Sequence, residues 1–105
     1  MTENVVRVTS NFYNVPDIKQ FIIKNIVSKN FDGKLDVYLK KLSAKKDAEV
    51  RLDYKIHQNK QGKYEAKFLF FLDWDRFTYS NKTGFKFVED LVNHAFDRFK
   101  EHLSK

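Results

Sequence analysis

The chain has 105 residues, of which 42% are apolar and 32% charged, and this argues for one folded domain and against wholesale disorder. It contains no cysteine, which excludes disulfide frameworks, cysteine-based zinc sites and thiol nucleophiles. Lys and Arg number 20 against 14 Asp and Glu, and the resulting net charge of +6 favours polyanionic partners or simply a well-solvated surface.

The first half of the chain predicts one strand followed by helix. The segment 5–9 is short and β-branched, as is typical of a strand. Pro16 and Asp17 suit the first turn of a helix, and apolar residues then recur at helical spacing. The segment 30–33 interrupts this helix with Asn and Gly, and a second helical run continues to Ser43. The sequence leaves open whether the two runs form one kinked helix or two helices.

Three further strands are expected after these helical runs. Apolar and charged residues alternate over 49–57, which is the clearest strand pattern in the chain. Residues 59–62 predict a hairpin turn, and the same alternation resumes over 64–72. Residues 73–75 can turn the chain, and 76–80 predict a short last strand.

A final helix completes the expected order β-α-β-β-β-α. Thr83 is expected to cap it, and its apolar stripe runs from Phe85 to Leu103. Because each helical region carries a single apolar stripe, both should pack on one face of a four-stranded, mostly antiparallel sheet. The predicted fold class is therefore α+β, a two-layer sandwich formed by one domain that spans residues 1–105.

Patterns typical of enzymes have little support in this chain. His57, His94 and His102 lack metal-ligand spacing among themselves, and the chain has no glycine-rich phosphate loop and no nucleophile elbow. Asp73 and Asp75 are better explained as turn formers than as paired catalytic acids. We therefore expect a binding protein, not an enzyme, with no metal and no cofactor.

The basic residues gather on the expected helices. Eight lysines fall between residues 19 and 46, and Lys86, Arg98 and Lys100 belong to the last helical region. If the helices lie side by side, their outer faces form one basic surface of the kind that docks on phosphates. A solubilising helical exterior is the competing interpretation, and composition alone is compatible with both.

The aromatic residues divide between a core and a possible contact surface. Four phenylalanines stand at spacings typical of core positions: Phe21, Phe85, Phe96 and Phe99. Leu69 and Phe71 should lie on the sheet face away from the helices, as candidates for a protein contact. Glu65, Lys67 and Asp73 make that face mixed in charge, which counts against stacking of RNA bases. The apolar area is too small for a stable interface of about 1,200 Å², so we expect a monomer or weak dimer.

No targeting or membrane segment is expected. Residues 1–4 have neither a basic region nor a long apolar run, so they do not resemble a signal peptide. No stretch approaches the roughly 20 apolar residues of a membrane span. The expected location is the cytoplasm, without membrane partners.

Several local strings, taken in order, carry a family resemblance. They are Val15-Pro16-Asp17-Ile18-Lys19, Lys34-Leu35-Asp36-Val37-Tyr38-Leu39, Ala48-Glu49-Val50-Arg51-Leu52, Tyr64-Glu65-Ala66 and the last helix from Phe85 to Leu103. In their order and spacing, the chain resembles the ribosome hibernation-promoting factor and ribosome-associated inhibitor A family, the ribosomal subunit interface proteins. The resemblance covers nearly the whole chain and corresponds to a short member or to the N-terminal domain of a long one.

The resemblance implies a fold similar to double-stranded RNA-binding domains, and binding to ribosomal RNA of the small subunit in the channel for messenger and transfer RNA. Members of this family stop translation during stress. Carried over by position, the implied RNA-binding residues are Lys19, Lys24, Lys34, Lys86, Arg98 and Lys100. The leading hypothesis is therefore a ribosome-binding translation inhibitor. The alternative is a protein–protein interaction module of the same fold that uses Leu69 and Phe71 on the outer sheet face.

Overall fold

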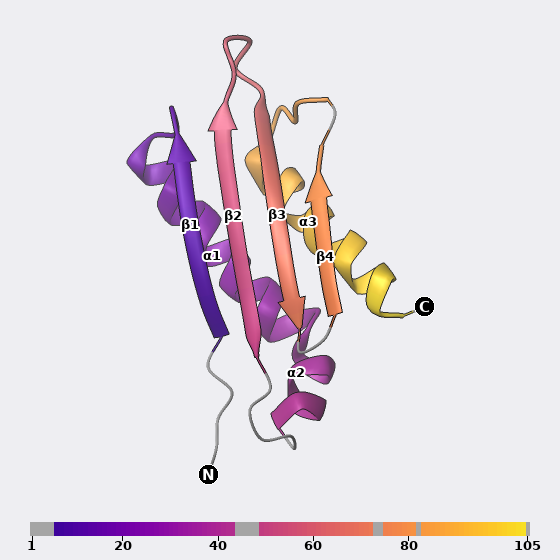
Figure 1. Cartoon of the computed structure of the whole chain (residues 1–105). Helices are drawn as coiled ribbons and strands as arrows, with labels where there is room; N and C mark the ends of the chain where they lie inside the picture. The colour runs from indigo at the N-terminus through magenta and orange to yellow at the C-terminus, as the bar shows by residue number, and fades with distance from the viewer. Residues whose placement is uncertain (1–5, 44–48, 73–74, 82, 105) are drawn as a thin grey trace.

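The computed structural model describes residues 6–43, 49–72, 75–81 and 83–104 (Figure 1). The elements in chain order are β1 (Val6–Tyr13), α1 (Asp17–Gly33), α2 (Asp36–Ser43), β2 (Val50–Gln58), β3 (Tyr64–Leu72), β4 (Asp75–Ser80) and α3 (Val88–Leu103). The expected order β-α-β-β-β-α is confirmed, with the first helical region divided into α1 and α2. Of the turn expected over 73–75, Asp73 and Trp74 lie outside the described residues, whereas Asp75 is not in a turn but is the first residue of β4 and pairs with Leu72.

The four strands form one sheet in the order β1-β2-β3-β4. β1 and β2 run parallel because the chain crosses over through α1 and α2 between them, whereas β2, β3 and β4 form antiparallel neighbours. Figure 1 shows α1 and α3 on the same side of the sheet. The expected two-layer α+β sandwich with a mostly antiparallel sheet is confirmed.

The hydrophobic core lies between the sheet and the helices. Alternate residues of β2 and β3 face the helices and are buried: Val50, Leu52, Tyr54, Ile56, Tyr64, Ala66, Phe68, Phe70 and Leu72. From α3 the buried residues are Val88, Leu91, Val92, Ala95, Phe96 and Phe99, so the expected stripe is confirmed over these positions. The Phe70 ring lies 4.3 Å from the Phe99 ring and 5.2 Å from the Phe96 ring, measured between centroids. Aromatic contacts therefore join β3 to α3 at the centre of the domain.

A buried asparagine marks the end of α1. The Asn30 side chain donates hydrogen bonds to the Ile26 carbonyl at 2.8 Å and to Asn93 Oδ1 at 3.0 Å, which ties α1 to α3. The Leu35 backbone N–H donates to the Asn30 carbonyl, and the Leu35 side chain is completely buried. Residues 34 and 35 lie between the end of α1 and the start of α2, so the two helical runs are separate helices.

Phe21 was expected to lie in the core, but it stands on the exposed face of α1. Its side chain is 67% exposed, because the buried face of α1 is formed by Ile23, Val27, Asn30 and Phe31. These four residues follow the spacing of 3 and 4 that defines one helix face, and Phe21 stands off that face. The expectation that Phe21 is a core residue is therefore wrong.

The segment before α3 also differs from the expectation. Thr83 does not cap α3, which begins at Val88, and Phe85 instead exchanges backbone hydrogen bonds of 2.7 and 2.8 Å with Tyr64. A Cβ on Gly84 would lie 2.6 Å from Lys63 Cβ, so this close approach requires glycine. Pairing with the start of β3 provides hydrogen-bond partners for the backbone of Phe85, so α3 begins later than expected.

Two smaller features complete the comparison with the sequence. The first strand was expected over 5–9 but extends to Tyr13, because parallel pairing with β2 continues through polar residues. The hairpin turn at 59–62 is present: Asn59 Oδ1 accepts hydrogen bonds from the backbone N–H groups of Gln61 and Lys63. Gly62 has φ +79°, which a side chain would disfavour.

Candidate functional site

The six cations expected to bind RNA lie in the helix layer, which we define as residues 17–43 and 86–103. Three of them contact acids of α3. Lys19 Nζ lies 3.8 Å from Glu89 Oε1, and Lys34 Nζ lies 2.6 Å from Asp97 Oδ1. Arg98 Nη1 lies 3.5 Å from Glu101 Oε2 on the same helix. These three cations are therefore already engaged within the protein.

The other three expected residues are Lys24, Lys86 and Lys100, and they form no ion pair with any residue that the structure describes. Lys24 extends from α1 toward β1, with its Nζ 6.0 Å from the centre of the Phe12 ring. Lys86 lies before α3, not on it, and Lys100 is exposed near the end of α3. The structure thus distributes these cations over different parts of the helix layer.

Charge in the helix layer is nearly balanced. Nine Lys and Arg stand against seven Asp and Glu, and α3 itself carries Glu89, Asp90, Asp97 and Glu101 against Arg98 and Lys100. The helices do lie side by side as expected, but acids are interspersed among their cations. Exposed ion pairs of this kind contribute about 0–1 kcal/mol each to stability, and they reduce the positive potential of the surface.

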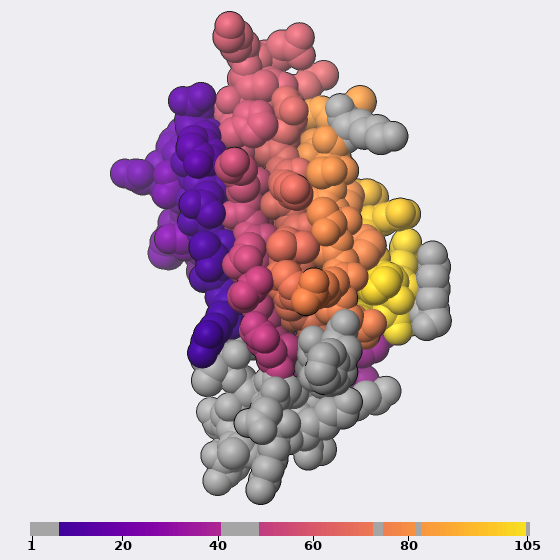
Figure 2. Space-filling model, in the orientation of Figure 1, coloured from indigo at the N-terminus to yellow at the C-terminus, as the bar shows by residue number. Residues whose placement is uncertain are grey.

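The opposite side of the sheet carries a different set of side chains. We define the outer sheet face by the residues whose register places them on the side away from the helices: Arg7, Thr9, Asn11, Tyr13, Arg51, Asp53, Lys55, His57, Glu65, Lys67, Leu69, Phe71, Arg76, Thr78 and Ser80. Figure 2 looks onto this face, and no helix covers the four strands there. Its five Lys and Arg stand against two acids.

Three arginines line up across this face. Strand pairing aligns Arg7 with Arg51, Arg51 with Phe71, and Phe71 with Arg76, so one row crosses all four strands. The guanidinium carbons of Arg51 and Arg76 lie 4.2 and 5.4 Å from the centre of the Phe71 ring. Adjacent strands are about 4.8 Å apart, so the row spans about 14 Å. We call these four residues the arginine band.

A second basic row lies about 13 Å further along the strands, given a rise of about 3.3 Å per residue. It contains Lys55 opposite Lys67, and we call this pair the lysine row. Lys55 Nζ lies 5.3 Å from the centre of the Tyr13 ring. Between the two rows is a shallow hollow of about 170 Å³, whose lining includes Asp53 and Leu69.

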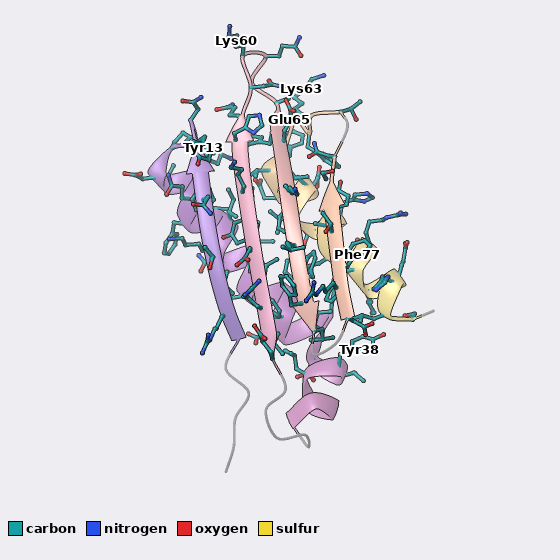
Figure 3. The ribbon with its side chains drawn as sticks, viewed as in Figure 1. Tyr13, Tyr38, Lys60, Lys63, Glu65 and Phe77 are labelled. Carbon is teal, nitrogen blue, oxygen red and sulfur yellow. The ribbon has the colours of Figure 1, made fainter. Side chains whose placement is uncertain are left out.

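The two acids of the outer sheet face each have a partner. Asp53 Oδ2 lies 3.4 Å from Arg51 Nε, and Glu65 accepts a hydrogen bond of 2.9 Å from the Asn59 side chain. Glu65 also lies 3.8 Å from His57 Nε2. Figure 3 shows that Glu65 stands near the hairpin end of the sheet, the end that also carries Lys60.

Leu69 and Phe71 lie on the outer sheet face, where the alternation of the sequence placed them, and both are half-buried. The two guanidinium groups that contact the Phe71 ring cover part of its apolar surface. The pair therefore does not form a bare apolar patch.

A groove of about 620 Å³ runs between β1 and α1 on the inner side of the sheet. Its lining includes Val8, Ser10, Lys24 and Tyr54.

Burial raises the pKa of Tyr54 above its usual value, and the Ser10 side chain acts in the opposite direction. Tyr79, near α3, also has a pKa raised by burial, with Arg98 opposing the shift. Both hydroxyl groups are therefore protonated at neutral pH.

No family model, curated protein or solved structure matches this chain. Within the described parts of the chain, no group of three or more His, Asp or Glu side chains could hold a metal ion. None of the helices that the structure describes is long and apolar enough to cross a membrane.

Sequence reasoning overlooked Arg7, Arg51 and Arg76 as a group. Each occupies an outward position of a strand, and alternation alone would have assigned Arg51 to the charged side of its strand. The alignment of the three depends on pairing between segments that are far apart in the sequence, which no local pattern reveals.

Proposed function

We propose that this protein is a non-enzymatic, cytoplasmic regulator of translation that binds ribosomal RNA of the small subunit. In this proposal it occupies the channel for messenger and transfer RNA during stress and so contributes to ribosome hibernation. The observation that carries the proposal is the fold: the order β-α-β-β-β-α, with α1 and α3 on one face of the sheet, is the arrangement that the sequence resemblance implies.

The charge of the molecule supports a polyanionic partner. The net charge is +6, and each cation that meets a phosphate releases condensed counterions, which provides a driving force independent of sequence. Of the six expected residues, Lys24, Lys86 and Lys100 can meet phosphates without giving up an ion pair within the described residues. Lys19, Lys34 and Arg98 would first have to exchange an acid for a phosphate.

The alternative function is a protein–protein interaction module that works through Leu69 and Phe71. The guanidinium groups of Arg51 and Arg76 beside the Phe71 ring make this surface more suitable for an anion than for an apolar partner. Ribosomal RNA is therefore the favoured partner.

Cosedimentation of the full chain with purified small ribosomal subunits tests the proposal. Binding through six or more phosphates should weaken by about a thousandfold or more between about 50 and about 200 mM salt. Inhibition of cell-free translation should follow the same salt dependence. Failure to cosediment at the lower salt would contradict the proposal, and cosedimentation unaffected by salt would favour the protein–protein alternative.

A further inference from the structure

We propose that the outer sheet face is a docking surface for single-stranded RNA, whose phosphates contact the arginine band and the lysine row. This inference rests on the proposed RNA binding but assigns it to the side of the sheet opposite the helix layer. The partner is identified by charge complementarity with the five cations gathered there.

The first argument is that these cations are available. Arg7, Lys55, Lys67 and Arg76 form no ion pair with any residue in the described ranges, whereas Arg51 forms two, with Asp53 at 3.4 Å and with Glu49 at 3.8 Å. In the helix layer, by contrast, three of the six expected cations are paired with acids of α3. The outer sheet face can therefore receive phosphates with less rearrangement.

The second argument concerns like charges placed opposite one another. Arg7 pairs in register with Arg51, and Lys55 pairs with Lys67. Directly opposed side chains on neighbouring strands have Cβ atoms about 4.5–5.5 Å apart, and like charges at that distance destabilise a sheet. A phosphate between two such cations converts repulsion into attraction, so an RNA strand would relieve both pairs at once.

The third argument is how the arginines are held. Contacts of Arg51 and Arg76 with the Phe71 ring restrict the two guanidinium groups before any partner arrives. A guanidinium group presents a fork of N–H donors to phosphate oxygens, and its plane can also stack on an unpaired base. Restricting these side chains in advance lowers the entropy lost on binding.

The two acids of the outer sheet face do not prevent an RNA strand from crossing it. Asp53 and Glu65 stand in the two rows that lack a Lys or Arg pair, and each contacts a partner within the protein. A strand of RNA can therefore cross from the arginine band to the lysine row and pass Asp53 while that carboxylate remains beside Arg51.

Fluorescence anisotropy with a labelled single-stranded RNA oligonucleotide of mixed sequence tests this inference. The double variant Arg7→Gln/Arg76→Gln removes two cations from the outer sheet face. The matched control Lys29→Gln/Lys60→Gln removes two cations that lie on α1 and at the hairpin tip, away from the outer sheet face and from the six expected RNA-binding residues, and that have no ion pair in the described ranges. All four positions are exposed, and thermal unfolding of each variant checks that the fold is intact.

Each lost phosphate contact on a single strand lowers the slope of log affinity against log salt by about 0.7, so the outer-face variant should lose about 1.4 units. The control should keep the wild-type slope. An equal loss in both variants, or a loss in the control alone, would overturn the assignment to the outer sheet face. Binding of polyglutamate as tightly as RNA would overturn RNA as the partner in favour of an acidic protein.

The ribosome experiment separates this inference from the proposed function. If the wild type binds the oligonucleotide through the outer sheet face but does not cosediment with small subunits, the docking surface stands and the ribosomal function falls. If the wild type cosediments and the outer-face variant retains its full salt slope on RNA, the function stands and the docking surface falls.

Discussion

The helix layer and the outer sheet face use their cations in opposite ways. In the helix layer, Lys19 and Lys34 reach from α1 or its end to acids on α3, so that positive charge helps to join neighbouring elements. On the outer sheet face, Arg7 and Arg51 stand beside each other, as do Lys55 and Lys67. The contrast teaches that cations counted along a sequence reveal little about which of them are available to a partner. Availability depends on where the acids lie in the fold.

The largest expected effect is a difference in stability between substitutions on the two sides of β3. Phe70→Ala should lower the free energy of unfolding by about 3–5 kcal/mol, because the ring is buried and stacks on Phe99. Phe71→Ala, one position away on the opposite side, should cost only about 1–2 kcal/mol, the value of two cation–π contacts. Urea unfolding of both variants measures the difference. Equal losses would contradict the assignment of Phe71 to a partly exposed outer face.

The next effect is the pH dependence of the unfolding free energy that arises from Tyr54 on the inner side of the sheet. Burial raises the pKa of Tyr54 above 10.0, so its stabilising contribution is fully present below pH 10 and is lost as pH rises toward the folded-state pKa. Over that interval the unfolding free energy should fall by at most about 1.4 kcal/mol per pH unit. Tyr54→Phe should remove this component, as urea unfolding at pH values on both sides of 10 would reveal. Parallel pH profiles for the two proteins would contradict the prediction.

A charge reversal should distinguish stability from binding on the outer sheet face. Lys67→Glu places a carboxylate opposite Lys55 and should raise the unfolding free energy by about 0.2–1 kcal/mol, while it weakens RNA binding. The gain should shrink as salt is added, because the pair is exposed. Lys60→Glu at the hairpin tip makes the same charge change outside the strand ladder, and it should produce no such gain.

The smallest effect tests the link between α1 and α3. A double-mutant cycle with Lys34→Ala and Asp97→Ala should give a coupling energy of about 0.2–1 kcal/mol, since both side chains are partly exposed. High salt should reduce this coupling. A coupling indistinguishable from zero at low salt would mean that the ion pair does not help to join the helices.

The fold was largely predictable because its strongest signals are local. The alternation from Val50 to Ile56 and the stripe from Val88 to Phe99 each follow the period of one element and need no knowledge of the rest. Thr83 was assigned wrongly as a cap because the bridge between Tyr64 and Phe85 competes with helix formation there. That competition arises from tertiary structure and leaves no mark on the local sequence.

The candidate site was less predictable for the same reason. The presence of cations was evident from composition, but the pairing of Lys34 with Asp97 joins residues that are 63 positions apart. The alignment of Arg7 with Arg51 likewise depends on the register of two distant strands. Charge neutralisation and charge clustering are therefore both properties of the assembled fold.

The position of β1 has a consequence for the order of folding. Each residue of β1 pairs with one 44 positions later, from Val6 with Val50 to Tyr13 with His57, whereas Gln58 and Tyr64 at the hairpin are six positions apart. Contacts between distant residues form slowly because loop closure costs entropy, so β1 should dock last and open first. Its amide hydrogens should then exchange with solvent faster than those of β2 and β3. Because Arg7 belongs to β1, a ligand that spans the arginine band should slow exchange in this strand more than in any other.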